Sequence, residues 1–220
     1  GGNISNFLST HAKGNPALSV SLTAIATMLA IVLTPFNFYF YGKLYNNLGP
    51  WTDNVLLREL TINPVEMIKT VLILLGIPIV LGMLVNHKLP ALTEKIKKPI
   101  KAFLLIFFMG MVVMMFVNNY DHFIKYIFWI FIVVLIHNAV AVSSGFGFAK
   151  LFRLDSRNSR TIAIETGIQN SGLGLVLLFN PNIFPQDLAL GGMMIVTAWW
   201  GIWHILSGLT IATIWRRRTN

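Results

Sequence analysis

The fold of this chain depends on the stretch Thr161-Ile162-Ala163-Ile164-Glu165-Thr166-Gly167-Ile168-Gln169-Asn170-Ser171-Gly172-Leu173, in which a carboxylate and two amides interrupt an apolar segment. A carboxylate at the centre of a membrane-spanning helix costs about 2.5–3.5 kcal/mol on insertion scales, so a partner must offset the charge of Glu165. Glu165 and Gln169 share one helix face, and the glycines at 167 and 172 favour local unwinding that frees backbone carbonyls. We therefore predict a broken helix over residues 161–179.

The oxygen atoms of this break suit a cation. Carboxylate, amide and carbonyl oxygens are hard ligands, and they match a hard metal ion. In the structural alternative, Glu165 accepts a hydrogen bond from a neighbouring helix and only holds the helices together. The residues of the stretch leave both interpretations open.

The composition of the whole chain places that stretch in a membrane. Of 220 residues, 55% are hydrophobic and 11% are charged, at a mean hydropathy of +0.68, whereas an ordinary soluble domain has about 25% charged residues. A water-soluble globule is excluded, and we predict an all-helical polytopic membrane protein. The absence of cysteine excludes a disulfide framework and a thiolate metal site. We assign the net charge of +9 to loop cations that orient helices, not to nucleic-acid binding.

We predict six crossings, one of them broken, after an initial half-helix. A polar connection over 42–63 separates the first crossing from the second, and it contains a short interfacial helix near 55–60. The half-helix and the crossings cover residues 3–12, 17–34, 64–86, 100–117, 123–149, 161–179 and 188–215.

The positions of the lysines and arginines orient these crossings. Thirteen of the 17 cations fall in loops on one side of the membrane and three fall on the other side. Cytoplasmic loops carry the excess of cations, so we predict a cytoplasmic C-terminus and an external 42–63 connection.

A second polar cluster lies near the start of the chain. Ser5 and Asn6 belong to the half-helix, and Ser19, Thr23 and Thr27 follow one face of the next span. Transmembrane hydroxyls often bond to their own helix, so this pattern alone does not establish a binding site. However, two broken polar segments of opposite direction are typical of inverted repeats, whose broken helices cross at the midplane of the bilayer.

These residues resemble the bile acid:sodium symporter family, in particular its bacterial sodium-dependent transporters. The resemblance covers essentially the whole chain. Its motifs are Gly-Gly-x-x-Ser-Asn at 1–6, Lys-Gly-Asn-x-Ala-Leu-Ser-Val-x-x-Thr at 13–23, Glu-x-Gly-x-Gln-Asn-Ser-Gly-Leu at 165–173 and Trp-His-x-x-Ser-Gly at 203–208.

The resemblance implies an inverted-repeat transporter of ten helices with crossing discontinuous helices, divided into a core and a panel domain. This chain would begin at the break of helix four and lack helices one to three. Residues 1–36 would end the first repeat in the core, and 37–63 would be the external connection. Residues 64–118 would form panel helices six and seven, and 119–220 would form core helices eight to ten, with helix nine broken at 161–179.

The resemblance also implies the function and its residues: symport of an organic anion such as a bile acid with two sodium ions, by alternating access and without enzymatic activity. The protein would lie in the lipid bilayer of a bacterial inner membrane. The first sodium would be held by Ser5, Asn6, Ser19, Thr23 and Glu165. The second would be held by Glu165, the carbonyls of Thr166 and Ile168, the side chain of Gln169 and a ligand from the absent third helix. The anion would lie nearest Asn170 and His204.

Other functions remain as alternatives. A proton-coupled carrier or a non-transporting membrane sensor could use the same fold, and a relay through His137 and His204 would fit the former. An intramembrane serine hydrolase would need Ser171 as nucleophile and His204 as base, in contact with each other. Elsewhere, Glu66 and Lys69 are three residues apart and are expected to form a local ion pair.

Overall fold

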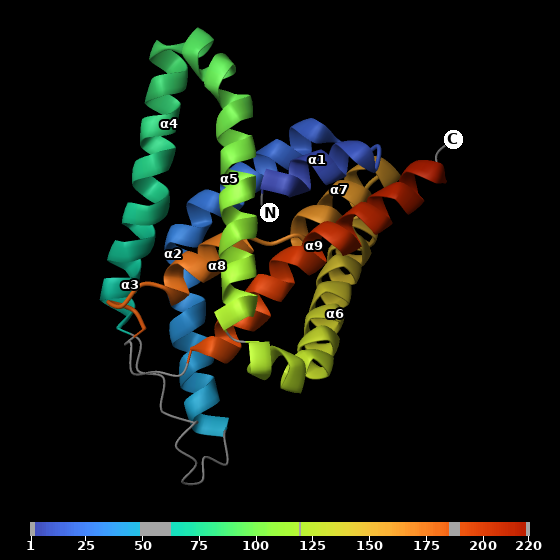
Figure 1. Ribbon diagram of the computed structural model, residues 1–220. Helices are drawn as coiled ribbons and strands as arrows, with labels where there is room; N and C mark the ends of the chain where they lie inside the picture. Colours follow the sequence, from blue (N-terminus) through green and yellow to red (C-terminus); the bar gives the residue numbers. More distant parts are fainter. Residues whose placement is uncertain (1–2, 49–62, 119, 185–189, 219–220) are drawn as a thin grey trace. The chain divides into compact units, whose positions relative to one another are not determined.

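The computed structural model describes residues 3–48, 63–118, 120–184 and 190–218, and over that part of the chain it is helical, without a strand (Figure 1). This confirms the prediction of an all-helical protein. The elements are α1 (Asn3–His11), α2 (Pro16–Leu48), α3 (Pro64–Val71), the π-helical turn η1 (Leu72–Gly76), α4 (Ile77–Lys88), α5 (Pro90–Asn118), α6 (Tyr120–Leu151), α7 (Ser156–Gly167), α8 (Ser171–Leu178) and α9 (Gly191–Arg217).

Four stretches of helix in the described residues are long and apolar enough to cross a membrane. They correspond to four of the six predicted crossings, and they identify a multi-pass membrane protein. The remaining two predicted crossings correspond to α5 and to the pair α7 and α8. The four spans are Pro16–Tyr45, Val65–Lys88, Phe123–Leu151 and Gly191–Arg217.

Two helices extend beyond their predicted bounds. Helix α2 continues past the predicted end of its span at residue 34, through the buried Pro35, to Leu48, so part of the predicted 37–63 connection is helical. Proline removes one hydrogen bond from a helix, but a membrane-spanning helix tolerates that loss. Helix α5 begins at Pro90, ten residues before the predicted start of its crossing at residue 100, since proline fits the first helical turn. The short helix predicted near 55–60 lies outside the described residues.

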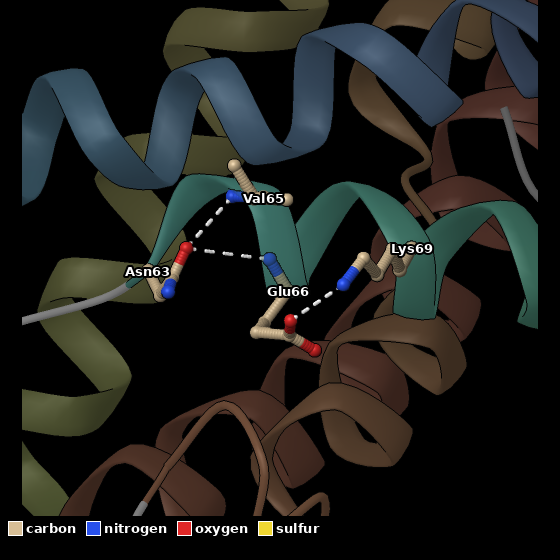
Figure 2. Close-up of polar contacts among 4 residues, drawn as sticks. All are labelled: Asn63, Val65, Glu66 and Lys69. Atoms are coloured by element: carbon tan, nitrogen blue, oxygen red, sulfur yellow. Dashed lines mark hydrogen bonds and ion pairs between the residues drawn. The ribbon is translucent and has the colours of Figure 1, made fainter.

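Helix α3 begins with a side-chain cap (Figure 2). The side-chain oxygen of Asn63 accepts hydrogen bonds from the backbone N–H groups of Val65 (3.0 Å) and Glu66 (3.4 Å). One turn later, Lys69 Nζ lies 2.8 Å from Glu66 Oε1, with both side chains exposed. The predicted local ion pair is confirmed.

The turn η1 separates α3 from α4 without ending the helical run. Pro78 lies in the first turn of α4. It has no N–H to donate to the carbonyl of Leu74, four residues earlier, and its ring would clash with that carbonyl in a regular α-helix. A π turn widens the hydrogen-bond ladder at that point, so the chain stays helical despite the proline.

The chain forms two compact units, which we describe separately. Unit 1 contains residues 1–26, 115–176 and 191–220, and unit 2 contains residues 27–114 and 177–190. Within unit 1, α7 packs against α6, α1 and α9, and α6 packs against α9. An apolar core joins α1, α7 and α9. It contains Leu8 of α1, Ala12 directly after α1, Ile164 of α7, Ile168 directly after α7, and Ala212 of α9.

Helices of unit 1 approach so closely that a Cβ atom on several of the glycines would overlap a neighbouring helix. A Cβ atom on Gly167 of α7 would lie 2.2 Å from Val142 Cγ2 of α6, and one on Gly208 of α9 would lie 2.5 Å from Leu8 Cδ1 of α1. Small residues allow this close backbone approach, which stabilises helix association in membranes.

The turn between α1 and α2 is bonded to the start of α7. Arg157 Nε donates to the carbonyl of Gly14 (3.0 Å), and the backbone N–H of Asn15 donates to Thr161 Oγ1 (2.7 Å). Asp155 caps α7 by accepting from the N–H of Asn158. The turn that precedes α2 and the beginning of α7 are therefore held together by hydrogen bonds.

We expect Gly167→Ala to lower the thermal unfolding midpoint of the full-length protein in detergent. The added methyl group would overlap Val142, and such overpacking costs about 1–3 kcal/mol. Gly147→Ala on α6 is the control, because a Cβ at Gly147 has no atom within 4 Å. That substitution should leave the midpoint unchanged or raise it, since alanine favours a helix. Equal midpoints for the two variants would contradict the close packing of α6 and α7.

Candidate cation site

Three helices of unit 1 bring polar side chains together around Glu165. Glu165 lies in the last turn of α7 and is 7% exposed. Asn6 lies in α1, and Ser19 and Thr23 lie one turn apart on α2. A four-residue spacing places two side chains on one helix face, so α2 presents both hydroxyls in the same direction.

Hydrogen bonds join these four side chains. Ser19 Oγ donates to Glu165 Oε1, and Thr23 Oγ1 lies 2.9 Å from Glu165 Oε2. The same two hydroxyls lie 2.8 Å and 3.3 Å from Asn6 Oδ1. Both oxygens of the carboxylate and the amide oxygen therefore face the hydroxyl pair of α2, and we call these four residues the oxygen cluster.

Each hydroxyl of the oxygen cluster faces two acceptor atoms. Each hydroxyl has one hydrogen, so Ser19 and Thr23 share two hydrogens among three acceptor atoms. Carboxylate, amide and hydroxyl oxygens in one place are the ligands that a hard cation prefers. Glu165 is the one carboxylate among these four residues, so the charge of the cluster suits a monovalent cation.

The break after α7 adjoins the oxygen cluster in sequence. Ile168 is extended (φ −101°, ψ 102°), and its N–H still donates to the carbonyl of Ile164 (2.8 Å). Gln169 is half-buried, and its Nε2 donates to the carbonyl of Thr166 (3.4 Å). The side chain of Gln169 thus lies against one of the freed carbonyls of the break.

The predicted residues of the first sodium site therefore lie in one neighbourhood. The structure brings Asn6, Ser19, Thr23 and Glu165 into contact, and Ser5 is buried beside Asn6 on α1. These contacts alone also fit the alternative in which Glu165 only joins helices.

The two predicted substrate residues lie in different surroundings. Asn170 is exposed and lies directly before α8. Its side-chain Oδ1 accepts a hydrogen bond from the backbone N–H of Leu173 (3.1 Å), so Asn170 caps that helix. His204 is 2% exposed, and neither ring nitrogen has a hydrogen-bond partner among the described residues. No hydrogen bond or ring contact joins Asn170 to His204 in the described part of the chain.

The contacts of His204 also bear on the alternatives. The ring of Trp200 lies 4.9 Å from that of His204 and 5.5 Å from that of His137, between centroids. Trp200 therefore contacts both histidines, but its ring carbon atoms do not relay a proton. Ser171 donates its backbone N–H to the carbonyl of Gln169, and His204 has no hydrogen bond to it, so the pair that a serine hydrolase needs is not formed here.

Sequence reasoning missed one polar contact of the break. Asn138 of α6 is 3% exposed, and its Nδ2 donates to the carbonyl of Gly167 (2.9 Å). The signal in the sequence was an amide in the middle of an apolar span, which is costly unless it is hydrogen-bonded. Its partner could not be identified from the sequence alone.

The sequence of the chain is similar to a known family and to several transporters. The sequence pattern of the sodium bile acid symporter family matches residues 1–126. The chain is 31% identical over its whole length to the uncharacterized sodium-dependent transporter YocS of Bacillus subtilis (strain 168), covering 62% of that protein. It is 30% identical to the ileal sodium/bile acid cotransporter of Oryctolagus cuniculus, over 86% of this chain and 51% of that protein.

A third relative is the sodium/bile acid cotransporter 5 of Mus musculus, which is 28% identical over 76% of this chain and 36% of that protein. The chain therefore spans between 36% and 62% of the length of these three relatives. Their names are those of transporters and not of enzymes. The family match covers more than half of the chain and agrees with the resemblance of its motifs, so the chain belongs to the sodium bile acid symporter family.

Proposed function

We propose that the full-length protein is a sodium-coupled symporter of organic anions, and that the oxygen cluster is its first sodium site. The observation that carries the proposal is the contact of both Glu165 oxygens with the hydroxyls of Ser19 and Thr23. The names of the relatives, which are sodium-dependent transporters and sodium/bile acid cotransporters, support the choice of ion.

The first sodium would replace the hydrogen bonds of the cluster. Ser19 and Thr23 would turn their hydroxyl hydrogens away and present lone pairs to the ion, beside Glu165 and Asn6. Ser5, buried on the same helix as Asn6, would complete the set. One carboxylate neutralises one monovalent ion, which removes most of the cost of placing either charge inside the bilayer.

A proton is the competing ion for the same carboxylate. Both oxygens of Glu165 face hydroxyls, which can donate to an ionised carboxylate or accept from a protonated one, so these contacts fit either ion. The printed names of the relatives specify sodium, and this favours sodium over a proton-coupled carrier.

The second sodium would lie at the break and share Glu165 with the first. The carbonyls of Thr166 and Ile168 and the side chain of Gln169 would supply the other ligands. Gln169 now donates Nε2 to the Thr166 carbonyl, and rotating the amide would present its oxygen to an ion. Sharing one carboxylate makes the affinity of each ion depend on the other.

The anion would bind beside the break. The exposed side chain of Asn170 and the two unpartnered ring nitrogens of His204 are polar groups that could receive a carboxylate. Bile acids are amphipathic carboxylates, and apolar sites with a few polar groups bind such molecules. Transport would follow alternating access, in which a core containing the broken helix moves against a panel domain that includes residues 64–118.

We expect Glu165→Gln in the full-length protein to weaken sodium binding by about 100-fold, or about 3 kcal/mol, because it removes the charge that offsets a desolvated ion. Ser19→Ala removes one neutral ligand and should cost about tenfold or less. The control is Glu66→Gln, whose exposed carboxylate pairs with Lys69. Titration calorimetry with sodium measures all three affinities. Wild-type affinity in Glu165→Gln would instead support a purely structural role for Glu165.

We expect single cysteines to report an external 42–63 connection and a cytoplasmic beginning of α5, as the distribution of cations predicts. The 220 residues contain no cysteine, so labelling in this region has no background. Asn47→Cys, near the exposed end of α2, should react with an impermeant maleimide in intact cells. Lys97→Cys should react only after the membrane is opened. The reverse pattern would invert the topology and place the C-terminus outside.

A further inference from the structure

A buried amide of α6 holds the backbone at the break of α7. Asn138 is 3% exposed in the middle of an apolar helix, and its Nδ2 lies 2.9 Å from the carbonyl oxygen of Gly167. Burying an unbonded amide at such a position would be strongly unfavourable, so this hydrogen bond is needed to keep Asn138 in the apolar helix.

The carbonyl of Gly167 is available because the helix ends there. In a continuous helix it would accept from the N–H of Ser171, four residues later. Ser171 instead donates its N–H to the carbonyl of Gln169 (3.2 Å). Asn138 therefore supplies, from another helix, the donor that the break removes.

The peptide unit between Gly167 and Ile168 is held at both ends. Its carbonyl accepts from Asn138, and its N–H donates to the carbonyl of Ile164 (2.8 Å). A peptide unit is planar, so these two hydrogen bonds fix its orientation. Val142, one turn after Asn138 on α6, adds a steric limit, because it lies where a Cβ of Gly167 would be.

We infer that Asn138 is a positioning residue for the second sodium site, a role that rests on the proposed function. The carbonyls of Thr166 and Ile168 belong to the peptide units on either side of the fixed one. By directing the Gly167 carbonyl toward α6, Asn138 keeps that carbonyl out of the site and sets the directions of the two neighbouring carbonyls. Asn138 does not touch the ion.

The decisive variant is Asn138→Leu in the full-length protein, because leucine has a similar size and no donor. Freed from Asn138, the peptide unit can rotate, and the carbonyls lose their alignment. Substituting a group that orients metal ligands typically costs about 10–100-fold in metal affinity, so we expect a rise of that size in the sodium concentration at half-saturation. Ser144→Ala is the matched control, since Ser144 is exposed on the same helix and bonds only to the carbonyl of Ala141.

Two measurements with sodium as the sole probe separate positioning from stability. Calorimetry gives the sodium affinity, and thermal unfolding in sodium-free and sodium-containing detergent buffer gives the rise in midpoint that sodium causes. We expect Asn138→Leu to lose most of that rise and Ser144→Ala to keep it. A structural role alone would lower both midpoints equally and leave the rise intact.

A second variant, Asn138→Ser, has a hydroxyl too short to reach Gly167 and should weaken sodium binding in the same direction. Wild-type sodium affinity in either folded variant would overturn the inference, as would failure of both to fold in the absence of sodium while Ser144→Ala folds. Absence of sodium binding by the unmodified protein would instead contradict the proposed function. The failure of this inference and that of the sodium site are thus distinguishable.

Discussion

The structure of unit 1 depends on one electrostatic constraint, the carboxylate of Glu165 inside an apolar helical bundle. It cannot remain there without partners, and α2 supplies two hydroxyls to its two oxygens. That requirement fixes the rotation of α2, because Ser19 and Thr23 must face α7. It also fixes the position of α1, whose Asn6 contacts the same hydroxyls. The apolar packing of α1, α7 and α9 then forms around this polar contact.

The end of α1 and the beginning of α7 reinforce this arrangement at a distance from Glu165. Arg157 bonds to the carbonyl of Gly14, and Arg160 bonds to that of Ala12 (3.1 Å). Arginine side chains thus satisfy carbonyls that the end of α1 leaves open. The turn that precedes the hydroxyl pair of α2 is therefore anchored to α7 by hydrogen bonds of its own, in addition to the contacts of Ser19 and Thr23 with Glu165.

Local pattern was sufficient to predict much of this. The interruption after Glu165 and the i, i+4 hydroxyls of α2 are visible in the sequence, because helix periodicity determines which residues share a face. The contact between α1, α2 and α7 was inferred from the resemblance to the symporter family, because the spacing of residues within one helix does not determine which helix lies opposite. For the same reason the partner of Asn138 was missed. The end of α2 was misplaced because Pro35 does not stop a membrane-spanning helix. The start of α5 was misplaced because a charged segment can be helical when a proline occupies its first turn.

The π turn η1 has a consequence for sequence alignment. In α3 the buried side chains of Met67 and Val71 follow one helical stripe, whereas α4, beyond the turn, buries none of its residues. A π turn accommodates one residue more than an α turn, so it shifts the phase of everything after it by about 100°. Deleting one residue between Leu72 and Gly76 would convert the π turn into an α turn and leave the residues of α4 on the faces that they now occupy. An alignment with a one-residue gap there therefore compares the same faces of the helix, whereas an ungapped alignment with a relative that lacks the π turn compares different ones.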